Sequence, residues 1–117
     1  EAIKTQLRGG KQAKVVWVGF QKLLAASRVF IKTDRVVVYT LYKPNPAQIV
    51  VEFPRATVPL RNNMRELTTS AFDTPVSRIR VHEDPKRQTV QVLIDLRPPV
   101  SYIYRQDGPY IYVDIER

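Results

Sequence analysis

The stretch "NPAQIVVEFP" (residues 45–54) is a turn followed by a hydrophobic segment, and "DGPYIYVDIE" (107–116) repeats that pattern near the end of the chain. Phe53 aligns with Ile115 at an offset of 62 residues. The same offset aligns Glu52 with Asp114, Val51 with Val113, Ile49 with Ile111, Asn45 with Asp107, Tyr42 with Tyr104 and Leu41 with Ile103. An offset of 63 aligns Val16 with Ile79 and Val18 with Val81. The chain therefore contains two similar halves.

Short segments rich in β-branched and aromatic residues, separated by turn formers, predict strands in both halves. They are residues 14–20, 28–33, 36–42 and 48–53 in the first half, and 77–81, 89–95, 100–105 and 110–115 in the second. Strands at intervals of about 8–12 residues are typical of an all-β sandwich. We expect a sandwich of two similar sheets built from two pseudo-repeated four-stranded halves, packed face to face so that each covers the other's apolar side.

Alternation with a period of two predicts which side chains point inward. The expected inner rows are Ile49, Val51 and Phe53, then Ile111, Val113 and Ile115, together with Val16, Val18, Phe20, Ile79 and Val81 of the first strand in each half. The outer rows are then Gln48, Val50 and Glu52, and Tyr110, Tyr112 and Asp114. By the same rule Trp17 and Arg80 point outward, at equivalent positions of the repeat.

Composition argues against most kinds of enzyme. Cysteine is absent and His82 is the one histidine, so thiol catalysis, cysteine-ligated metals and histidine-based triads lack their residues. No cofactor or metal is expected. The net charge is +8, from 19 basic and 11 acidic side chains. Residues 1–60 hold ten of the basic and three of the acidic side chains, which suits an acidic partner or a solvated surface.

Two segments of the chain lie outside the predicted strands. Residues 1–13 are expected to be a basic leader or linker, and 14–117 the folded domain. Between the halves, residues 55–77 are polar, and Met64, Leu67 and Phe72 suit either one amphipathic turn starting near Asn62 or Asn63, or an irregular crossover. No stretch reaches the roughly 20 apolar residues of a membrane span. Since the chain starts at Glu1, we expect it to be a piece of a longer protein.

Several of these segments resemble the AMIN domain, the module named for its place at the amino end of cell-wall amidases. "YKPNPAQIVVEFP" (42–54) is similar to the family phrase "sNPxRlVvDlp", and "VSRIRV" (76–81), "TVQVLIDL" (89–96) and "YIYRQDGPYIYVDI" (102–115) fit in order. The resemblance covers residues 14–116, and "LTTSAFDTPV" (67–76) looks most like copies in type IV pilus secretins. Two positions depart from the family: Gln48 replaces a frequent arginine and Glu52 an aspartate.

The resemblance implies a β-sandwich that targets envelope proteins to peptidoglycan in the bacterial periplasm, within an outer-membrane-associated protein. Peptidoglycan offers sugar rings, which aromatic faces cover, and carboxylates, which arginine forks grip. The predicted contacts are Trp17, Arg80, Tyr110 and Tyr112, with Gln48, Arg28 and Arg35 beside them. The same aromatics also suit a cross-strand ladder that only stabilises the sheet, or contact with another domain of the parent protein.

The sequence leaves four candidate functions. The first is a non-catalytic peptidoglycan-binding module that positions a larger envelope protein, most like a pilus or secretion secretin. The alternatives are a docking module for a pilus-assembly partner, using a sheet edge or face, and the targeting domain of a cell-wall amidase. Nucleic-acid binding is suggested only by the sequence pI of about 10.0 and is the least favoured partner.

Overall fold

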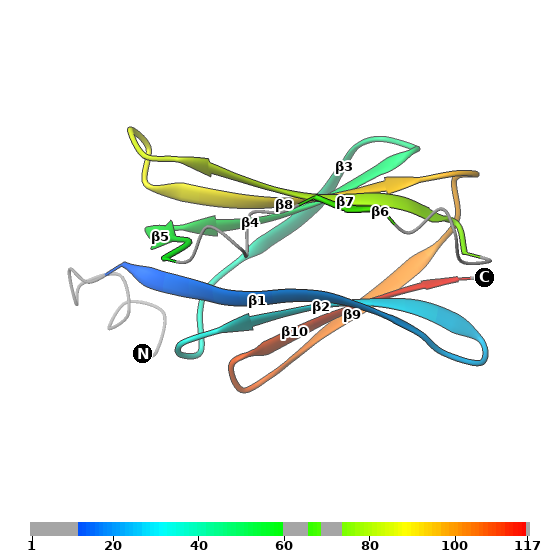
Figure 1. The fold of residues 1–117 in the computed structure, drawn as a ribbon, viewed down its shortest axis with the longest axis horizontal. Coiled ribbons are helices and arrows are strands. Elements are labelled where there is room, and N and C mark those ends of the chain that lie inside the picture. The colour runs from blue at the N-terminus through cyan, green and yellow to red at the C-terminus, as the bar shows by residue number, and fades with distance from the viewer. Residues whose placement is uncertain (1–11, 60–65, 69–73, 117) are drawn as a thin grey trace.

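The computed structural model describes residues 12–59, 66–68 and 74–116, and these form ten strands and no helix. The strands are β1 (Ala13–Lys22), β2 (Ala26–Thr33), β3 (Thr40–Asn45), β4 (Gln48–Pro54), β5 (Ala56–Thr57), β6 (Leu67–Thr68), β7 (Val76–Asp84), β8 (Thr89–Leu96), β9 (Tyr102–Asp107) and β10 (Tyr110–Glu116). The first sheet has the order β5-β1-β2-β10-β9, and the second has the order β3-β4-β8-β7-β6. The two sheets are stacked (Figure 1), which confirms the predicted all-β sandwich of two similar sheets.

The halves of the repeat are interleaved, contrary to the expectation that each half forms one sheet. The first sheet takes β1 and β2 from the first half and β9 and β10 from the second, and the second sheet takes β3, β4, β7 and β8. Of the eight long strands, the chain crosses from one sheet to the other after β2 and again after β8 (Figure 1), and the short β5, between β4 and β6, lies in the first sheet. Each half therefore contributes one hairpin to each sheet, and the two central pairs, β2–β10 and β4–β8, join different halves.

Strand register shows that the repeat is genuine. In the first sheet Ile111 pairs with Ile31, and in the second Ile49 pairs with Ile94. Ile111 follows Ile49 by 62 residues and Ile94 follows Ile31 by 63 residues, so the two pairs are equivalent in the repeat. Since a slip of one residue would turn every inner side chain outward, this matched register keeps both apolar rows on the core side.

The core is built from the predicted inner rows. Ile49, Val51, Phe53, Ile111, Val113 and Ile115 are all buried, as is Ile79, with Val18, Phe20 and Val81 packed against them. One prediction for β1 is wrong: Val15, not Val16, is fully buried. The pairing of β1 with β2 shifts between Val15 and Trp17. Such a bulge adds one residue to a strand and reverses the alternation on one side of it.

Two predicted strands are displaced along the sequence. Residues 36–42 were expected to form a strand, but β3 starts at Thr40, and Val36–Tyr39 belong to the crossing between sheets. Their apolar character has a different cause: Val37 is buried and the Tyr39 ring packs against Phe53, with ring centroids 6.2 Å apart. β9 likewise starts at Tyr102 instead of residue 100.

The edge strands also differ in register by one residue. Leu41 pairs with Val51, and Tyr104 pairs with Val113. Leu41 therefore corresponds to Tyr104, and not to Ile103 as the sequence alignment suggested. Ile103 instead pairs with Asp114 on the outer side and is 72% exposed.

The segment between the halves is described only in part. It contains β5, which pairs in parallel with the start of β1, and β6, in which Leu67 pairs with Ile79. Met64, Phe72, Asn62 and Asn63, and residues 1–11 of the expected leader, lie outside the described residues. Within the described part, no helix is long and apolar enough to cross a membrane.

Candidate functional site

The outer face of the first sheet carries rings and cations in rows across its strands. Trp17 of β1 is 55% exposed and pairs with Lys32 of β2, which pairs with Tyr110 of β10. In the next row Phe30 pairs with Tyr112, and Tyr112 with Arg105 of β9. Side chains of paired residues lie side by side on one face. We define the aromatic-basic face as Trp17, Arg28, Phe30, Lys32, Arg105, Tyr110 and Tyr112.

The rings of this face are fixed by their neighbours. Tyr110 and Tyr112 are stacked, with ring centroids 5.9 Å apart and planes 9° from parallel. The guanidinium carbons of Arg105 and Arg28 lie 4.4 and 4.9 Å from the Tyr112 ring centroid, and Lys32 Nζ lies 5.6 Å from that of Tyr110. Each cation–π contact at an exposed site contributes about 0.5–1 kcal/mol. The aromatics thus form the predicted ladder and still present partly exposed rings to solvent.

Two of the cations differ in what holds them. Arg28 grips Asp114 with two bonds, Nε to Oδ1 at 2.7 Å and Nη2 to Oδ2 at 3.0 Å. This hydrogen bonding to Asp114 is the main reason that the pKa of Arg28 is raised. The ion pair of Arg105 is loose, 3.8 Å to Asp107, and both side chains are more than half exposed. Arg28 is therefore committed to the sheet, whereas Arg105 and Lys32 supply the accessible positive charge.

Gly19 explains how a phenylalanine fits at the centre of this face. It pairs with Phe30, and a Cβ atom at position 19 would lie 2.3 Å from the Phe30 Cζ atom. Nonbonded carbons do not approach that closely, so the ring occupies the space that a side chain on Gly19 would need. A glycine inside an otherwise β-branched strand is the sequence signal for such a close approach.

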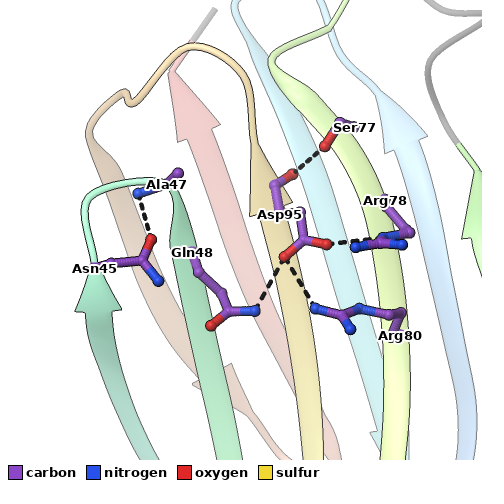
Figure 2. A network of polar contacts seen from close by, with 7 residues as sticks. All are labelled: Asn45, Ala47, Gln48, Ser77, Arg78, Arg80 and Asp95. Atoms are coloured by element: carbon purple, nitrogen blue, oxygen red, sulfur yellow. Dashed lines mark hydrogen bonds and ion pairs between the residues drawn. The ribbon is translucent and has the colours of Figure 1, made fainter.

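The outer face of the second sheet carries a different arrangement, shown in Figure 2. Asp95 of β8 lies at its centre and accepts hydrogen bonds from Gln48 Nε2 at 3.0 Å, Arg78 Nε at 2.9 Å and Arg80 Nη2 at 3.3 Å. Ser77 Oγ donates to the Asp95 backbone carbonyl at 3.2 Å. We call Gln48, Arg78, Arg80 and Asp95 the Asp95 network.

The charges of the Asp95 network favour the ionised carboxylate. Partial burial opposes ionisation of Asp95, but the hydrogen bonds from Arg78 and Gln48 and the charges of Arg80 and Arg78 outweigh it, so its pKa lies below the ordinary value of 3.8. The bond to Asp95 likewise raises the pKa of Arg78. Arg80 Nε is buried and has no hydrogen-bond partner among the described residues. Within the described part, the network offers more donors than acceptors.

A hollow of about 570 Å³ opens beside this network. It is lined by Asn45 and Ala47 of the β3–β4 turn, by Gln48, and by residues 77–78 and 95–97. Asn45 Oδ1 accepts a bond from the Ala47 backbone N–H at 2.9 Å, which fixes the turn. The volume is within the range of about 300–1,000 Å³ typical of small-ligand clefts.

The structure brings only some of the predicted site residues together. Trp17, Tyr110, Tyr112 and Arg28 share the aromatic-basic face, whereas Arg80 and Gln48 lie on the opposite outer face. Arg35 lies in the connection after β2, where its Nη2 is 2.8 Å from Asp34 Oδ2.

Trp17 and Arg80 point outward as predicted but are not equivalent. Trp17 pairs with Lys32, the counterpart of Asp95, so its equivalent is Arg78. In the same way the equivalent of Arg80 is Gly19.

No metal centre is found in the described residues: nowhere do three or more histidine, aspartate or glutamate side chains gather around one point.

Val50, predicted in an outer row, is only 2% exposed although it is not part of the core cluster. It pairs with Tyr42 and Leu93, which lie on either side of it on the outer face.

A comparison with protein-family models matches the AMIN domain over residues 20–115, most of the chain. The chain belongs to the AMIN domain family. AMIN domains are generally non-catalytic modules that bind peptidoglycan and target their parent proteins, and they occur in periplasmic and envelope proteins. A comparison with curated protein sequences found no match. The AMIN match spans both halves of the repeat and includes the residues of both outer faces described above except Trp17 and Gly19, which precede it.

Proposed function

We propose that this AMIN domain is a non-catalytic module that holds a larger envelope protein against peptidoglycan, and that the aromatic-basic face makes the contact. The observation that carries the proposal is the stack of Tyr110 and Tyr112, flanked by Arg105 and Lys32, on an exposed sheet face. Ring faces of this kind cover the apolar side of a sugar, while a guanidinium group binds a carboxylate. Trp17 extends the same row by one strand.

Fixed rings suit a polymer ligand better than mobile ones. Because the cation–π contacts and the stack already hold the tyrosines, binding costs little further side-chain entropy. Repetition along a glycan also allows many copies of the parent protein to bind side by side. A modest affinity per domain is therefore sufficient for positioning.

Sedimentation with purified, insoluble sacculi tests this function. The unmodified chain is expected in the pellet at low salt, and Tyr112→Ala is expected to bind roughly tenfold more weakly, which corresponds to about 1.4 kcal/mol. The matched control is Tyr42→Ala, which removes a tyrosine from the opposite outer face and should bind as the unmodified chain does. Thermal unfolding of each variant verifies folding. A chain that stays in the supernatant, or equal losses in both variants, contradicts the proposal.

For the parent protein we propose a type IV pilus or secretion secretin, with the domain in the periplasm. The support is the segment "LTTSAFDTPV" (67–76), which is most similar to secretin copies. The flanking sequence decides between the alternatives. Further β domains and an outer-membrane barrel are expected, whereas a zinc amidase module would make this the targeting domain of a cell-wall hydrolase.

A docking function is the second candidate, and the β9 edge favours it. Within the described residues β9 is bonded on one side only, to β10, and its Ile103 and Tyr104 are 72% and 55% exposed. An extended segment of an assembly partner can add a strand to such an edge. Proline at Ile103 would then abolish partner capture and leave sacculus binding intact, whereas an unchanged capture would exclude the edge as the docking site.

A further inference from the structure

The hollow beside the Asp95 network has the chemistry of a site for an anion. Asp95 accepts bonds from Gln48, Arg78 and Arg80, so its two carboxylate oxygens are already used by the protein. A cation would have to displace two guanidinium groups to reach it. An added acceptor, in contrast, would find donors that Asp95 does not satisfy.

Donors around this hollow exceed the acceptors that the described residues provide. Asp95 engages the Nε of Arg78, which lines the hollow, and one nitrogen of Arg80, which lies behind the lining and whose buried Nε has no partner in the described part of the chain. Leaving a buried donor unsatisfied is unfavourable, because the group loses its hydrogen bonds to water on burial. Arg97 adds a third guanidinium group at the rim. Among the described residues the nearby carboxylates are Asp95 itself and Glu66, so the described groups around the hollow carry a net positive charge.

Asp95 acts here as a positioning residue. Its pKa is held below the ordinary value, so it remains a carboxylate at neutral pH and keeps the two arginines from β7 in place. The planar, forked guanidinium group matches a second carboxylate better than it matches a point charge. Pre-orientation of this kind reduces the entropy lost when the ligand binds.

The remaining lining of the hollow fits an amide and a small apolar side chain. Gln48 uses its Nε2 on Asp95, and Asn45 uses its Oδ1 on the Ala47 N–H, which leaves the Gln48 oxygen as an acceptor and the Asn45 amide nitrogen as a donor. Ala47 and Leu96 provide apolar surface at the same rim.

We infer that the hollow between the β3–β4 turn and the ends of β7 and β8 binds the terminal carboxylate of a short peptide, with Arg78 and Arg97 as its direct contacts. The inference rests on the proposed function only in naming the wall peptide as the source. It gives the domain a second contact, on the face opposite the aromatic-basic face. One face would then bind glycan and the other a peptide end.

A titration with small probes tests the site. The ¹⁵N-labelled chain is titrated with N-acetyl-D-alanyl-D-alanine, and saturable shifts are expected at the backbone amides of Ala47, Gln48, Arg78 and Arg97. The same dipeptide with a C-terminal carboxamide is expected to cause none. Inorganic phosphate at equal concentration should bind at least tenfold more weakly. Equal binding of the carboxamide, or equal or tighter binding of phosphate, overturns the assignment to a carboxylate.

Variants separate binding from folding. Arg78→Gln and Arg97→Gln are each expected to weaken the dipeptide at least tenfold, and Arg105→Gln on the opposite face should leave it unchanged. Arg97→Gln matters most if Arg78→Gln is unfolded, because the Arg97 side chain takes no part in the bonds to Asp95. Normal binding by a folded Arg97→Gln variant and a folded Arg78→Gln variant refutes the site.

The two proposals fail in different ways. A chain that binds the dipeptide but does not sediment with sacculi disproves the proposed function and leaves the carboxylate site standing. A chain that sediments through Tyr112 but shows no shifts with the dipeptide disproves only the present inference.

Discussion

The two outer faces occupy equivalent positions of the repeat and carry opposite chemistry. By strand register, the row Trp17, Lys32 and Tyr110 on the first sheet corresponds to Arg78, Asp95 and Gln48 on the second, and the row Gly19, Phe30 and Tyr112 corresponds to Arg80, Leu93 and Val50. The position that Lys32 occupies among aromatic rings on one face is thus occupied on the other face by Asp95, which is surrounded by hydrogen-bond donors. The inner rows stay apolar on both sheets, so the repeat constrains the core and leaves the outer faces free to diverge.

The third row shows which property the repeat does retain on its outer faces. Arg28 donates to Asp114 on the first sheet, and Gln91 Nε2 donates to Glu52 Oε1 at 2.8 Å on the second. In both cases the donor is on the second strand of its half and the acceptor on the fourth. The direction of the cross-strand bond is kept although the positive charge is lost. Pairing in the sheet, and not ligand chemistry, accounts for this common feature.

The largest predicted effect tests whether the inner rows are as similar as the register indicates. Ile31 and Ile94 are equivalent, fully buried residues of the two sheets. Ile31→Ala and Ile94→Ala should each lower the free energy of unfolding by about 2–5 kcal/mol, because each removes buried methyl groups and leaves a cavity. Urea denaturation measures both. Losses that differ by more than about 2 kcal/mol would show that the two halves of the core do not respond alike.

A smaller effect on stability is expected at Gly19, whose equivalent on the other outer face is Arg80. Gly19→Ala places a Cβ atom against the Phe30 ring and should cost about 1–3 kcal/mol, as overpacking does. Leu93, the counterpart of Phe30, already lies opposite the large side chain of Arg80. In a Phe30→Leu background, Gly19→Ala should therefore cost less than about 0.5 kcal/mol, the usual scale for surface substitutions. Thermal unfolding of the four chains gives the coupling, and an undiminished cost in the double variant would refute it.

The fold could be predicted from sequence down to the faces of its strands, but not to the neighbours of each strand. Alternation in "QIVVEF" and "YIYVDI" predicted which side chains face the core, although Val50 on the outer face is buried as well. It carries no information on whether β2 pairs with β3 or with β10. Val36–Tyr39 were predicted to be a strand because they are apolar, but the segment that connects the two sheets is apolar as well.

The candidate site was predictable in part for the same reason. Outward rings at Tyr110, Tyr112 and Trp17 follow from alternation, and the structure places them together. Alternation does not say which sheet an outward residue is on, so Arg80 and Gln48 were grouped with the wrong face. The Asp95 network was missed because its members come from three strands whose order in the sheet the sequence does not reveal.

The smallest predicted effect on stability concerns Asp95 and Lys32, the equivalent positions at which the two outer faces differ most. Asp95→Asn replaces an acceptor of three hydrogen bonds and should cost about 1 kcal/mol at pH 7, a low value because the side chain is partly exposed. Lys32→Gln, the matched control on the other face, should change stability by less than about 0.5 kcal/mol. Urea denaturation at several pH values measures both variants.

The pH dependence of that difference has a definite sign. The pKa of Asp95 is lower in the folded chain than its ordinary value of 3.8, so ionised Asp95 stabilises the folded chain fully above that pH. As the pH falls below 3.8 and through the folded pKa, Asp95 takes up a proton and the advantage over asparagine is lost. The stability gap between the unmodified chain and Asp95→Asn should therefore be constant from pH 7 to pH 5 and shrink below pH 4. A gap of equal size at pH 3 and pH 7 would mean that Asp95 holds its arginines by geometry alone, and that its charge contributes nothing to the network.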